Sequence, residues 1–298
     1  MKNVVVTGAT SFIGIHLIKK LLQNNYKVYA VVRPNSKNIA RLQKHSNMVI
    51  LEVELSNTKD ITNYISGDIY AFYHLAWEGA RAPYRDDKVM QEKNYQAAID
   101  AFEVALSLNV KKFIGIGSQA EYGKFNGAVD EAYPCNPLTE YGKSKYATYL
   151  TILKLASEKN IKFYWPRIFS AYGPYDYEKS LIMTCIDKMQ KNETIDMTEC
   201  TQNWDYIYID DIVEALIKFL DIDCENGAYN LASGNSRQLK LFVEEIKKYT
   251  NSKSIVKYGA IPYGENGPIN LQPDITKIKK ALDWKPVISF DKGIKKMI

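Results

Sequence analysis

The sequence predicts an α/β protein whose core is a doubly wound, mostly parallel sheet, with a smaller lobe formed by the C-terminal part of the chain. Three observations support this prediction. Short β-rich segments alternate with helical segments through the first half of the chain. A strand, a glycine turn and a helix follow one another at the N-terminus. The 298 residues are 46% hydrophobic, which is enough apolar material for a large buried core.

The strands are predicted from short apolar segments rich in β-branched and aromatic residues. Strands that alternate with helices form βαβ units, in which the strands run parallel and helices cover both faces of the sheet. We expect strands at residues 3–6, 27–32, 48–53, 69–74, 112–116 and 162–165.

The helices between these strands are predicted from apolar residues that recur every three or four positions. This periodicity indicates helices over residues 88–108 and 141–158. In the first helix the recurring residues are Phe12, Ile13, Leu17, Ile18, Leu21 and Leu22.

The pattern becomes less regular after Tyr172, which marks the expected boundary between two parts of the chain. We expect a first domain at residues 1–172 and a lobe at residues 173–298, with some segments of the lobe returning to the first domain. Within the lobe we expect helices at 180–191 and 239–249 and a loop at 258–268, and we note an apolar run at 204–209 and a further segment at 229–232.

The net charge, the apolar runs and the positions of cysteine and histidine argue against a nucleic-acid-binding protein, a membrane protein and a metalloprotein. Lys and Arg total 39 against 34 Asp and Glu, so the charge of +5 is small and implies no nucleic-acid partner. No apolar run approaches about 18 residues and no export signal is evident, so we expect a cytoplasmic protein without membrane contact. No metal site is expected, because cysteines and histidines lie far apart. They are Cys135, Cys185, Cys200, Cys224, His16, His45 and His74.

Residues 4–14 have the pattern of a phosphate-binding turn. Gly8 permits a tight turn after the strand, and Gly14 permits close packing of the following helix. Amides at the helix N-terminus would then point unpaired N–H groups at an anion. Ser11 stands where a middle glycine is usual, so the alternative is a plain connection between strand and helix.

The end of the second strand bears on which dinucleotide would bind. An acidic residue there suits the ribose hydroxyls of NAD(H), and a basic residue suits the 2′-phosphate of NADP(H). The chain has Arg33 at this point and no acid nearby. We therefore expect NADP(H), with NAD(H) possible if Arg33 is only a surface charge.

Tyr141 and Lys145 are one helical turn apart, so their side chains share a face of the predicted helix. A nearby ammonium lowers the pKa of a phenol from about 10, which gives a usable proton donor or acceptor. Ser118 follows a predicted strand at the carboxyl edge of the sheet, where ligands bind. We expect Ser118 to hold a substrate oxygen beside Tyr141. The alternative is an ordinary exposed helix face.

Several motifs follow one another along nearly the whole chain. They are Thr7-Gly8-x-x-x-Phe12-x-Gly14, His74-Leu75-Ala76, Asn94, Gly117-Ser118, Tyr122-Gly123, Tyr141-x-x-x-Lys145, Pro166-Arg167, Tyr172-Gly173-Pro174 and Asp205-Tyr206-x-x-x-Asp210-Asp211. Together they resemble the extended short-chain dehydrogenase/reductases, the NAD-dependent epimerase/dehydratase family of sugar-nucleotide enzymes.

This resemblance implies a Rossmann domain for a nicotinamide dinucleotide and a C-terminal lobe that binds a sugar nucleotide. It implies that Ser118 holds the sugar oxygen, that Tyr141 exchanges a proton, and that Lys145 also contacts the nicotinamide ribose. Other residues are implied along the cofactor: Gly8, Ser11, Phe12, Ile13 and Gly14 at the diphosphate, Glu54 and Leu55 near adenine, and Leu75 and Ala76 beyond them.

Departures from the family pattern help to select a reaction. The family's dehydratases carry an Asp-Glu pair after the catalytic Ser or Thr, where this chain has Gln119 and Ala120, so dehydration is not expected. Its epimerases keep NAD bound, whereas its ketoreductases consume NADPH. Because Arg33 favours NADPH, it favours a ketoreductase. We expect NADPH-dependent reduction at C4 of a dTDP- or CDP-linked 4-keto-6-deoxysugar. The alternative is an NAD-dependent nucleotide-sugar 4-epimerase.

Three more departures predict an atypical nucleotide pocket. Glu54 replaces the usual aspartate, Ser170 an asparagine and Trp204 an arginine.

A nucleotide sensor or RNA-binding protein that kept the fold without the chemistry is a further alternative. It is disfavoured because such a protein has no need of the combined Ser, Tyr and Lys.

The loop after the fourth strand is expected to overhang the substrate. It carries Trp77, Arg81 and Arg85, which are candidates for contacts to the sugar or the diphosphate, and the alternative is a solvated loop. The resemblance also implies that the helices carrying Asn94 and Tyr141 pair across a dimer interface, so we expect a homodimer.

Overall fold

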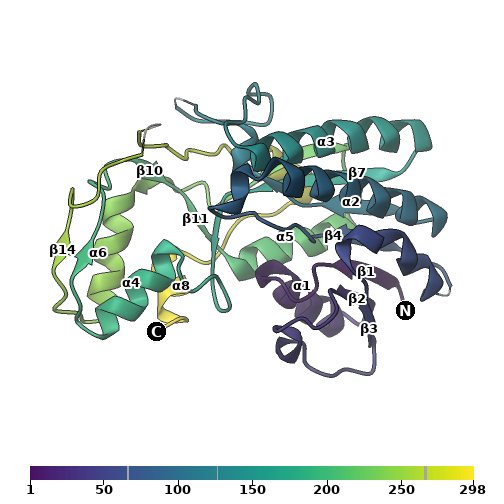
Figure 1. The fold of residues 1–298 in the computed structure, drawn as a ribbon, viewed down its shortest axis with the longest axis horizontal. Coiled ribbons are helices and arrows are strands. Elements are labelled where there is room, and N and C mark those ends of the chain that lie inside the picture. Colours follow the sequence, from purple (N-terminus) through teal and green to yellow (C-terminus); the bar gives the residue numbers. More distant parts are fainter. Residues whose placement is uncertain (66, 126, 265–266) are drawn as a thin grey trace.

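One large parallel sheet with helices on both faces dominates the computed structural model, which describes residues 1–65, 67–125, 127–264 and 267–298 (Figure 1). The predicted α/β fold class is confirmed. All pairings of this sheet are parallel. Its strand order is β3 (Met48–Glu52), β2 (Lys27–Val32), β1 (Asn3–Thr7), β4 (Ala71–His74), β5 (Lys112–Gly115), β7 (Lys162–Ile168) and β12 (Gly227–Leu231), and β6 (Gly117–Ser118) also pairs with β7.

Strand β1 shows why the sheet is covered on both faces. Its side chains alternate between the faces, and Val4, Val5 and Val6 are all fully buried. Val4 and Val6 belong to the hydrophobic cluster on one face, and Val5 belongs to the cluster on the other. A strand buried on both sides reads as a continuous apolar run, as the sequence showed here.

The helices form two layers, one on each face of the sheet (Figure 1). Helices α1 (Phe12–Gln23) and α5 (Ile209–Asp221) pack together on one face of the sheet. Helices α2 (Lys88–Ser107) and α3 (Glu140–Lys159) pack together on the other face. The 3-10 segment η2 (Leu55–Asn63) packs against α2, and the remaining 3-10 turns are η1 (Ile39–Arg41), η3 (Tyr84–Asp86) and η4 (Gln119–Glu121).

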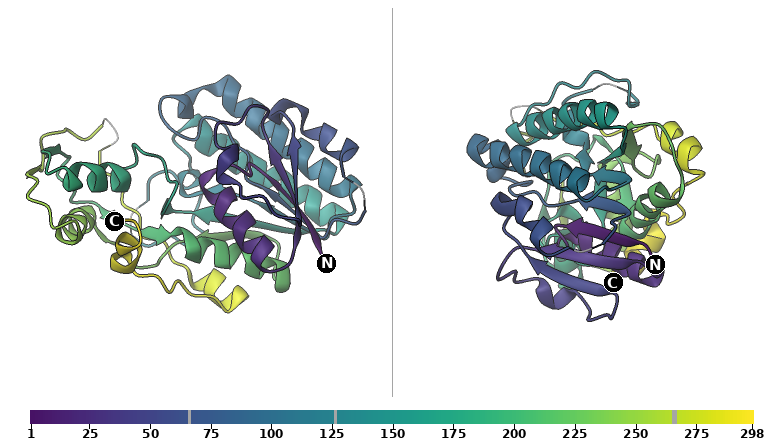
Figure 2. Two further views of the ribbon diagram at one scale, coloured as in Figure 1. Left: turned by 90° about the horizontal axis from the view of Figure 1, so that it is seen from below. Right: turned by 90° about the vertical axis from the view of Figure 1, so that its right-hand side faces the viewer.

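The C-terminal lobe lies beyond the carboxyl edge of the sheet, as the two views of Figure 2 show. Its elements are helices α4 (Leu181–Gln190), α6 (Leu239–Tyr249) and α8 (Phe290–Lys295), and the strand pairs β8 (Ser170–Tyr172) with β11 (Tyr206–Tyr208), β9 (Ile195–Asp196) with β14 (Val256–Lys257), and β10 (Asn203–Trp204) with β13 (Arg237–Gln238). One cluster of buried residues continues from Val6 under the sheet to Phe242 and Phe290 in the lobe. The lobe therefore shares its core with the sheet.

Several segments of the second half of the sequence return to the sheet. Strand β12 adds to its edge, α5 covers one face, and α7 (Thr276–Leu282) packs against both. Lys112 of β5 fixes the end of α5, because its buried ammonium donates to the carbonyls of Phe219 and Leu220 at 3.0 and 2.8 Å. Among the described residues, none forms a helix long and apolar enough to cross a membrane.

The structure departs from the predicted elements mainly in the lobe. The apolar run at 204–209 contributes to two short strands, β10 and β11, that are separated by Asp205, whose buried carboxylate accepts hydrogen bonds from the amides of Ser233 and Asn235. That side chain needs polar partners, so the strand cannot continue through it. Helices α5, α7 and α8 were not predicted. In α5, apolar residues such as Ile212 and Leu216 recur at helical spacing, and this signal was available.

Candidate active site

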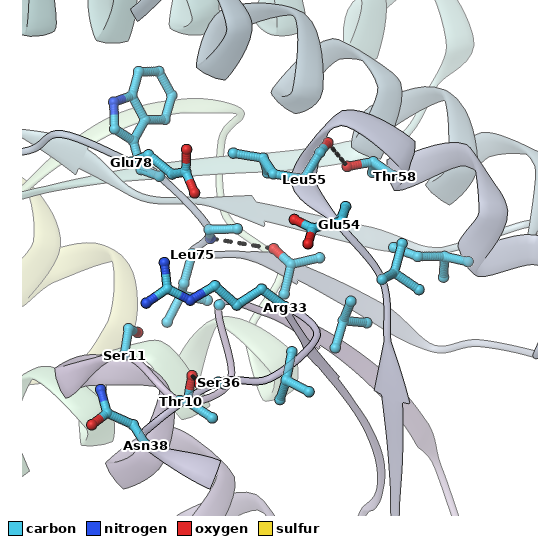
Figure 3. A pocket seen from close by; sticks show the side chains of 18 residues that line it. Thr10, Ser11, Arg33, Ser36, Asn38, Glu54, Leu55, Thr58, Leu75 and Glu78 are labelled. Atoms are coloured by element: carbon cyan, nitrogen blue, oxygen red, sulfur yellow. Dashed lines mark hydrogen bonds between the residues drawn. The ribbon is translucent and has the colours of Figure 1, made fainter. Parts of the chain in front are cut away.

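A pocket opens at the carboxyl edge of the sheet, where β1, β2 and β4 end, and we call it the edge pocket (Figure 3). Its open volume is about 840 Å³. Its walls come from the turns that follow these strands and from the start of η2. The predicted residues that line it are Gly8, Ser11, Arg33, Glu54, Leu55, Leu75 and Ala76.

The turn between β1 and α1 has the features expected of a diphosphate-binding turn. Gly8 has φ +67°, and a Cβ there would lie 2.7 Å from the backbone nitrogen of the segment after β4. A Cβ at Gly14 would lie 2.4 Å from the Gly8 oxygen, so both positions require glycine. Ser11 caps α1 by accepting from the Gly14 amide at 3.1 Å. The amides of Phe12 and Ile13 stay unpaired at the helix start among the described residues.

Arg33 and Glu54 bring opposite charges into the edge pocket. Both side chains are exposed, and neither makes a hydrogen bond or ion pair with a residue that the structure describes. In Figure 3 the Arg33 guanidinium points away from Glu54, toward the side of the pocket that carries Ser11. An unpaired guanidinium in a pocket can bind a phosphate, and an unpaired carboxylate can accept from ribose hydroxyls.

The edge pocket also contains polar residues that the sequence analysis missed. Ser36 and Asn38 follow Arg33 around the turn after β2, and the Ser36 hydroxyl lies 3.0 Å from that of Thr10. These groups put hydroxyls and an amide on the same side as the guanidinium (Figure 3). The signal for them was the run of polar residues directly after Arg33. Thr58 and Glu78 complete the missed part of the lining.

Ser118 is held at the end of β6 by a buried charge pair. Its hydroxyl accepts from the Ala120 amide at 3.2 Å, and its own amide donates to the Glu121 carboxylate at 2.8 Å. Glu121 is completely buried and also accepts from Trp165 Nε1 at 2.9 Å and from Arg167 Nε at 2.8 Å. This arrangement fixes the backbone on both sides of the Ser118 hydroxyl.

Tyr141 lies in the first turn of α3, where its phenol is near enough to the Ser118 side chain for that side chain to lower the pKa of the phenol. Burial raises the pKa of the phenol above its ordinary value. The Ser118 side chain and the positive charges of Arg85 and Arg81 oppose this effect, while the Glu121 charge adds to it. The net result is a phenol that remains protonated at neutral pH.

Lys145 is 4% exposed, so the alternative of an exposed helix face is wrong for this residue. Its ammonium donates to the Ile116 carbonyl at 2.8 Å and lies 6.0 Å from the centre of the Tyr141 ring. Burial lowers the pKa of Lys145 to about 7, against the opposing charge of Glu121. That Lys145 lowers the pKa of Tyr141 stays a prediction: the ammonium is directed at a backbone carbonyl, and the positive charges that most lower this pKa are those of Arg85 and Arg81.

The loop that follows β4, residues 77–87, lies against this pair, and we call it the strap. Trp77 lies with its indole centre 3.6 Å from the Lys145 ammonium and its edge toward the Tyr141 ring, 6.1 Å between centroids. Its Nε1 donates to Gln91 on α2 at 2.8 Å. Gln91 and Asn94 also bind backbone groups of the strap at 2.8 to 3.1 Å. Two buried amides of α2 therefore hold the strap in place.

The two arginines of the strap have different partners. Arg81 donates to Asp176 at 3.2 Å and so links the strap to the lobe. Arg85 has its guanidinium carbon 5.1 Å from the centre of the Tyr141 ring, and its buried Nε has no partner among the described residues. The alternative of a solvated loop is therefore wrong for Trp77 and Arg85, whereas the Arg81 side chain is half exposed.

Trp77 lies between the predicted cofactor-binding residues of the edge pocket and the predicted catalytic residues. This side chain lines the edge pocket and also contacts Lys145 and Tyr141, which do not line it themselves. Ser118, Tyr141 and Lys145, which we call the catalytic corner, thus lie next to the pocket and behind one indole. A phenol, a hydroxyl and an ammonium beside a pocket lined by a diphosphate-binding turn suit proton transfer coupled to hydride transfer.

Comparison with known proteins places these features in a family context. Residues 4–232 match the model of the NAD dependent epimerase/dehydratase family. CDP-abequose synthase of Salmonella muenchen is 29% identical over 306 residues, which cover 100% of this chain and 97% of the relative. The dTDP-4-dehydro-6-deoxyglucose reductase of Escherichia coli is 26% identical, with 99% and 96% covered.

Solved structures show the same fold over the whole chain. A UDP-glucose 4-epimerase of Thermotoga maritima, solved with UDP-glucose, superposes with a TM-score of 0.90 at 23% identity, covering 99% of this chain and 96% of that one. A UDP-N-acetylglucosamine 4-epimerase of Methanobrevibacter ruminantium, solved with UDP-N-acetylmuramic acid, gives 0.89 at 25% identity, with 99% and 98% covered.

Proposed function

We propose that this chain, which belongs to the NAD dependent epimerase/dehydratase family, reduces the 4-keto group of a dTDP- or CDP-linked 4-keto-6-deoxysugar with NADPH. Membership of the family makes the protein a sugar-nucleotide enzyme that uses a nicotinamide cofactor. The direction of reaction, the sugar and the choice of NADPH are the proposal.

The residues of the edge pocket suit such a cofactor. The unpaired amides of Phe12 and Ile13 would hold its diphosphate, and Arg33 with Ser36 would hold a 2′-phosphate. Lys145 would reach the nicotinamide ribose. When bound, the cofactor supplies the hydride that converts the sugar carbonyl to an alcohol.

The catalytic corner supplies the proton. The Ser118 hydroxyl holds the keto oxygen, and the Tyr141 phenol donates its proton to that oxygen as the carbonyl is reduced. The phenolate that forms is stabilised by Ser118 and by the positive charges of the strap arginines. A proton from solvent then restores the phenol, so each turnover uses one hydride and one proton.

The observation that carries this proposal is the placement of the Tyr141 phenol beside the Ser118 side chain and against Trp77, which lines the edge pocket. A protonated phenol is the form that reduction requires at its start, because the keto oxygen must gain a proton. The Arg33 side chain, with no protein partner among the described residues, supports NADPH. The two curated relatives described above are a CDP-sugar enzyme and a reductase of a dTDP-4-keto-6-deoxysugar, which supports the substrate class.

A nucleotide-sugar 4-epimerase with retained NAD is the second candidate. It is favoured by the unpaired carboxylate of Glu54 in the edge pocket, which could accept from ribose hydroxyls. The solved epimerases of the same fold are consistent with it.

The purified protein with NADPH and a panel of dTDP- and CDP-4-keto-6-deoxyhexoses separates the two candidates. Consumption of one NADPH for each ketosugar reduced, followed by the loss of nicotinamide absorbance, supports the proposal. Denaturation of the protein as purified provides the second measurement. Release of one equivalent of NAD, together with interconversion of 4-epimers without net NADPH use, would establish the epimerase instead.

We also propose a homodimer formed through α2 and α3. Val89 and Leu150, at 64% and 47% exposure, place apolar side chains at the surface of these two helices. Sedimentation equilibrium should give twice the 34.1 kDa mass of the chain, and Leu150→Glu should shift it toward the monomer. A monomer at micromolar concentration would contradict the proposal.

A further inference from the structure

The Lys145 ammonium occupies an unusual place, and its surroundings are not explained by the predicted chemistry. It is 4% exposed and, among the described residues, has one hydrogen-bond partner, the Ile116 carbonyl. The face of an indole, that of Trp77, covers it at 3.6 Å, and the ring of Trp165 lies 5.7 Å away. A desolvated ammonium loses its hydration, and an aromatic face is one of the few uncharged surfaces that attract it.

Trp77 is itself fixed by the residues around it. Its Nε1 donates to Gln91, which is 1% exposed and also binds two carbonyls of the strap. Its ring meets Tyr141 edge to face, with the ring planes at 89°. A side chain held at its nitrogen and along its edge cannot leave the ammonium without breaking a buried hydrogen bond.

We propose that Trp77 is a positioning residue, whose indole keeps Lys145 charged and holds it between the Tyr141 phenol and the edge pocket. This inference rests on the proposed function for its effect on turnover, but not for its effect on Lys145 itself. Trp77 is the residue of the pocket lining that contacts both helical members of the catalytic corner.

Few charged groups lie close enough to Lys145 to affect the pKa of its ammonium. Burial lowers the pKa of Lys145 to about 7, and Glu121 below it acts in the opposite direction. The charge of Lys145 in turn helps to lower the pKa of His74 on β4 to about 3, after the larger effect of burial, so that imidazole is neutral. The titratable or charged groups that face this region are Glu121, His74, Tyr141 and Arg85.

An indole face favours the ammonium over the neutral amine, so its removal should lower the pKa of Lys145 further. Activity that needs the ammonium falls as the pH rises through that pKa. In Trp77→Leu the alkaline limb of the kcat profile should therefore move to lower pH by about one unit, the size of a desolvated cation–π contact. Trp77→Phe keeps an aromatic ring and should shift the alkaline limb less. Gln91→Leu removes only the hydrogen bond to the indole nitrogen and should also shift it less.

A measurement without turnover tests the same contact if the proposed reaction is wrong. An ammonium against an indole alters its fluorescence, so the emission of the wild-type protein should show a titration step near pH 7. The step should be absent from Trp77→Phe and from Lys145→Met, and present in the control Trp204→Phe.

The results separate the proposal from a purely structural role. Loss of the emission step in the two variants, with a shifted alkaline limb, supports it. An emission step that keeps its full size in Trp77→Phe overturns it, because the remaining indole near the ammonium, Trp165, is farther away. A loss of kcat by the same factor at every pH also overturns it. Absence of any turnover in the wild-type protein, with the emission step intact, would reject the proposed reaction and leave the role of Trp77 standing.

Discussion

The edge pocket and the catalytic corner lie side by side but are built in opposite ways. In the pocket, Arg33 and Glu54 are exposed and have no partner among the described residues. In the corner, Ser118 and Lys145 are hydrogen-bonded to the protein, and the pKa values of Tyr141 and Lys145 are shifted by burial. The pocket leaves its charges for a ligand, whereas the corner is organised before a ligand arrives.

This difference indicates how the two functions are divided. A site for a charged cofactor gains affinity from groups that are unpaired until it binds. A site for proton transfer gains rate from groups whose positions and pKa values are fixed in advance. Substitutions in the pocket should therefore change binding, and substitutions in the corner should change kcat or the stability of the fold.

The strongest test of this division is Tyr141→Phe. Removal of the phenolic hydroxyl should lower kcat by about 10²–10⁴-fold, because it removes the proton donor, and should leave NADPH affinity nearly unchanged. Steady-state kinetics and fluorescence titration with NADPH measure the two quantities. Tyr146→Phe, on the same helix, is the control and should keep full activity. Turnover that survives in Tyr141→Phe would remove the corner from the mechanism.

The buried pair beneath Ser118 should contribute mainly to stability. Glu121→Gln leaves the Arg167 guanidinium buried without a counter-charge, so the free energy of unfolding should fall by about 3–5 kcal/mol. Urea unfolding measures the change. The control is Glu103→Gln, which breaks an exposed pair with Lys59 and should cost at most about 1 kcal/mol. Equal losses in the two variants would mean that the corner is not preorganised by this pair.

In the pocket, the expected change is in cofactor preference. Arg33→Gln should weaken NADPH binding by about 10–100-fold, the value of one or two charge-assisted hydrogen bonds, and should leave NADH binding unaltered. Equilibrium titration with each nucleotide gives the ratio. Lys37→Gln removes a neighbouring exposed charge and is the matched control. A similar loss for both nucleotides would assign Arg33 to the diphosphate or to the surface.

The smallest expected effect concerns Arg85, the strap residue whose guanidinium lies against the Tyr141 ring. Its charge lowers the pKa of Tyr141, so Arg85→Gln should raise that pKa. The limb of the kcat profile that reports the phenol should then move to higher pH by about half a unit, as expected for a partly exposed charge. Lys88→Gln, just beyond the strap, should leave the profile in place. A shift to lower pH would contradict the assigned charge effect.

The part of the site that the sequence predicts best is the part made by local structure. Gly8 and Gly14 are required by a tight turn and a close helix, and these constraints are readable within a dozen residues. Tyr141 and Lys145 share a face because they are one turn apart on α3. The part predicted worst is the lobe, where β10 and β11 are two and three residues long and depend on distant partners such as Ser233.

The sequence by itself determined the alternation of strands and helices. It also determined which polar residues follow the carboxyl ends of the strands. Only the tertiary structure decided their electrostatics. An indole from the strap and the carbonyl of Ile116, between β5 and β6, surround the Lys145 ammonium, and burial raises the pKa of Tyr141. Burial and the contacts between distant segments set a pKa, and neither is encoded in the spacing of two residues on one helix.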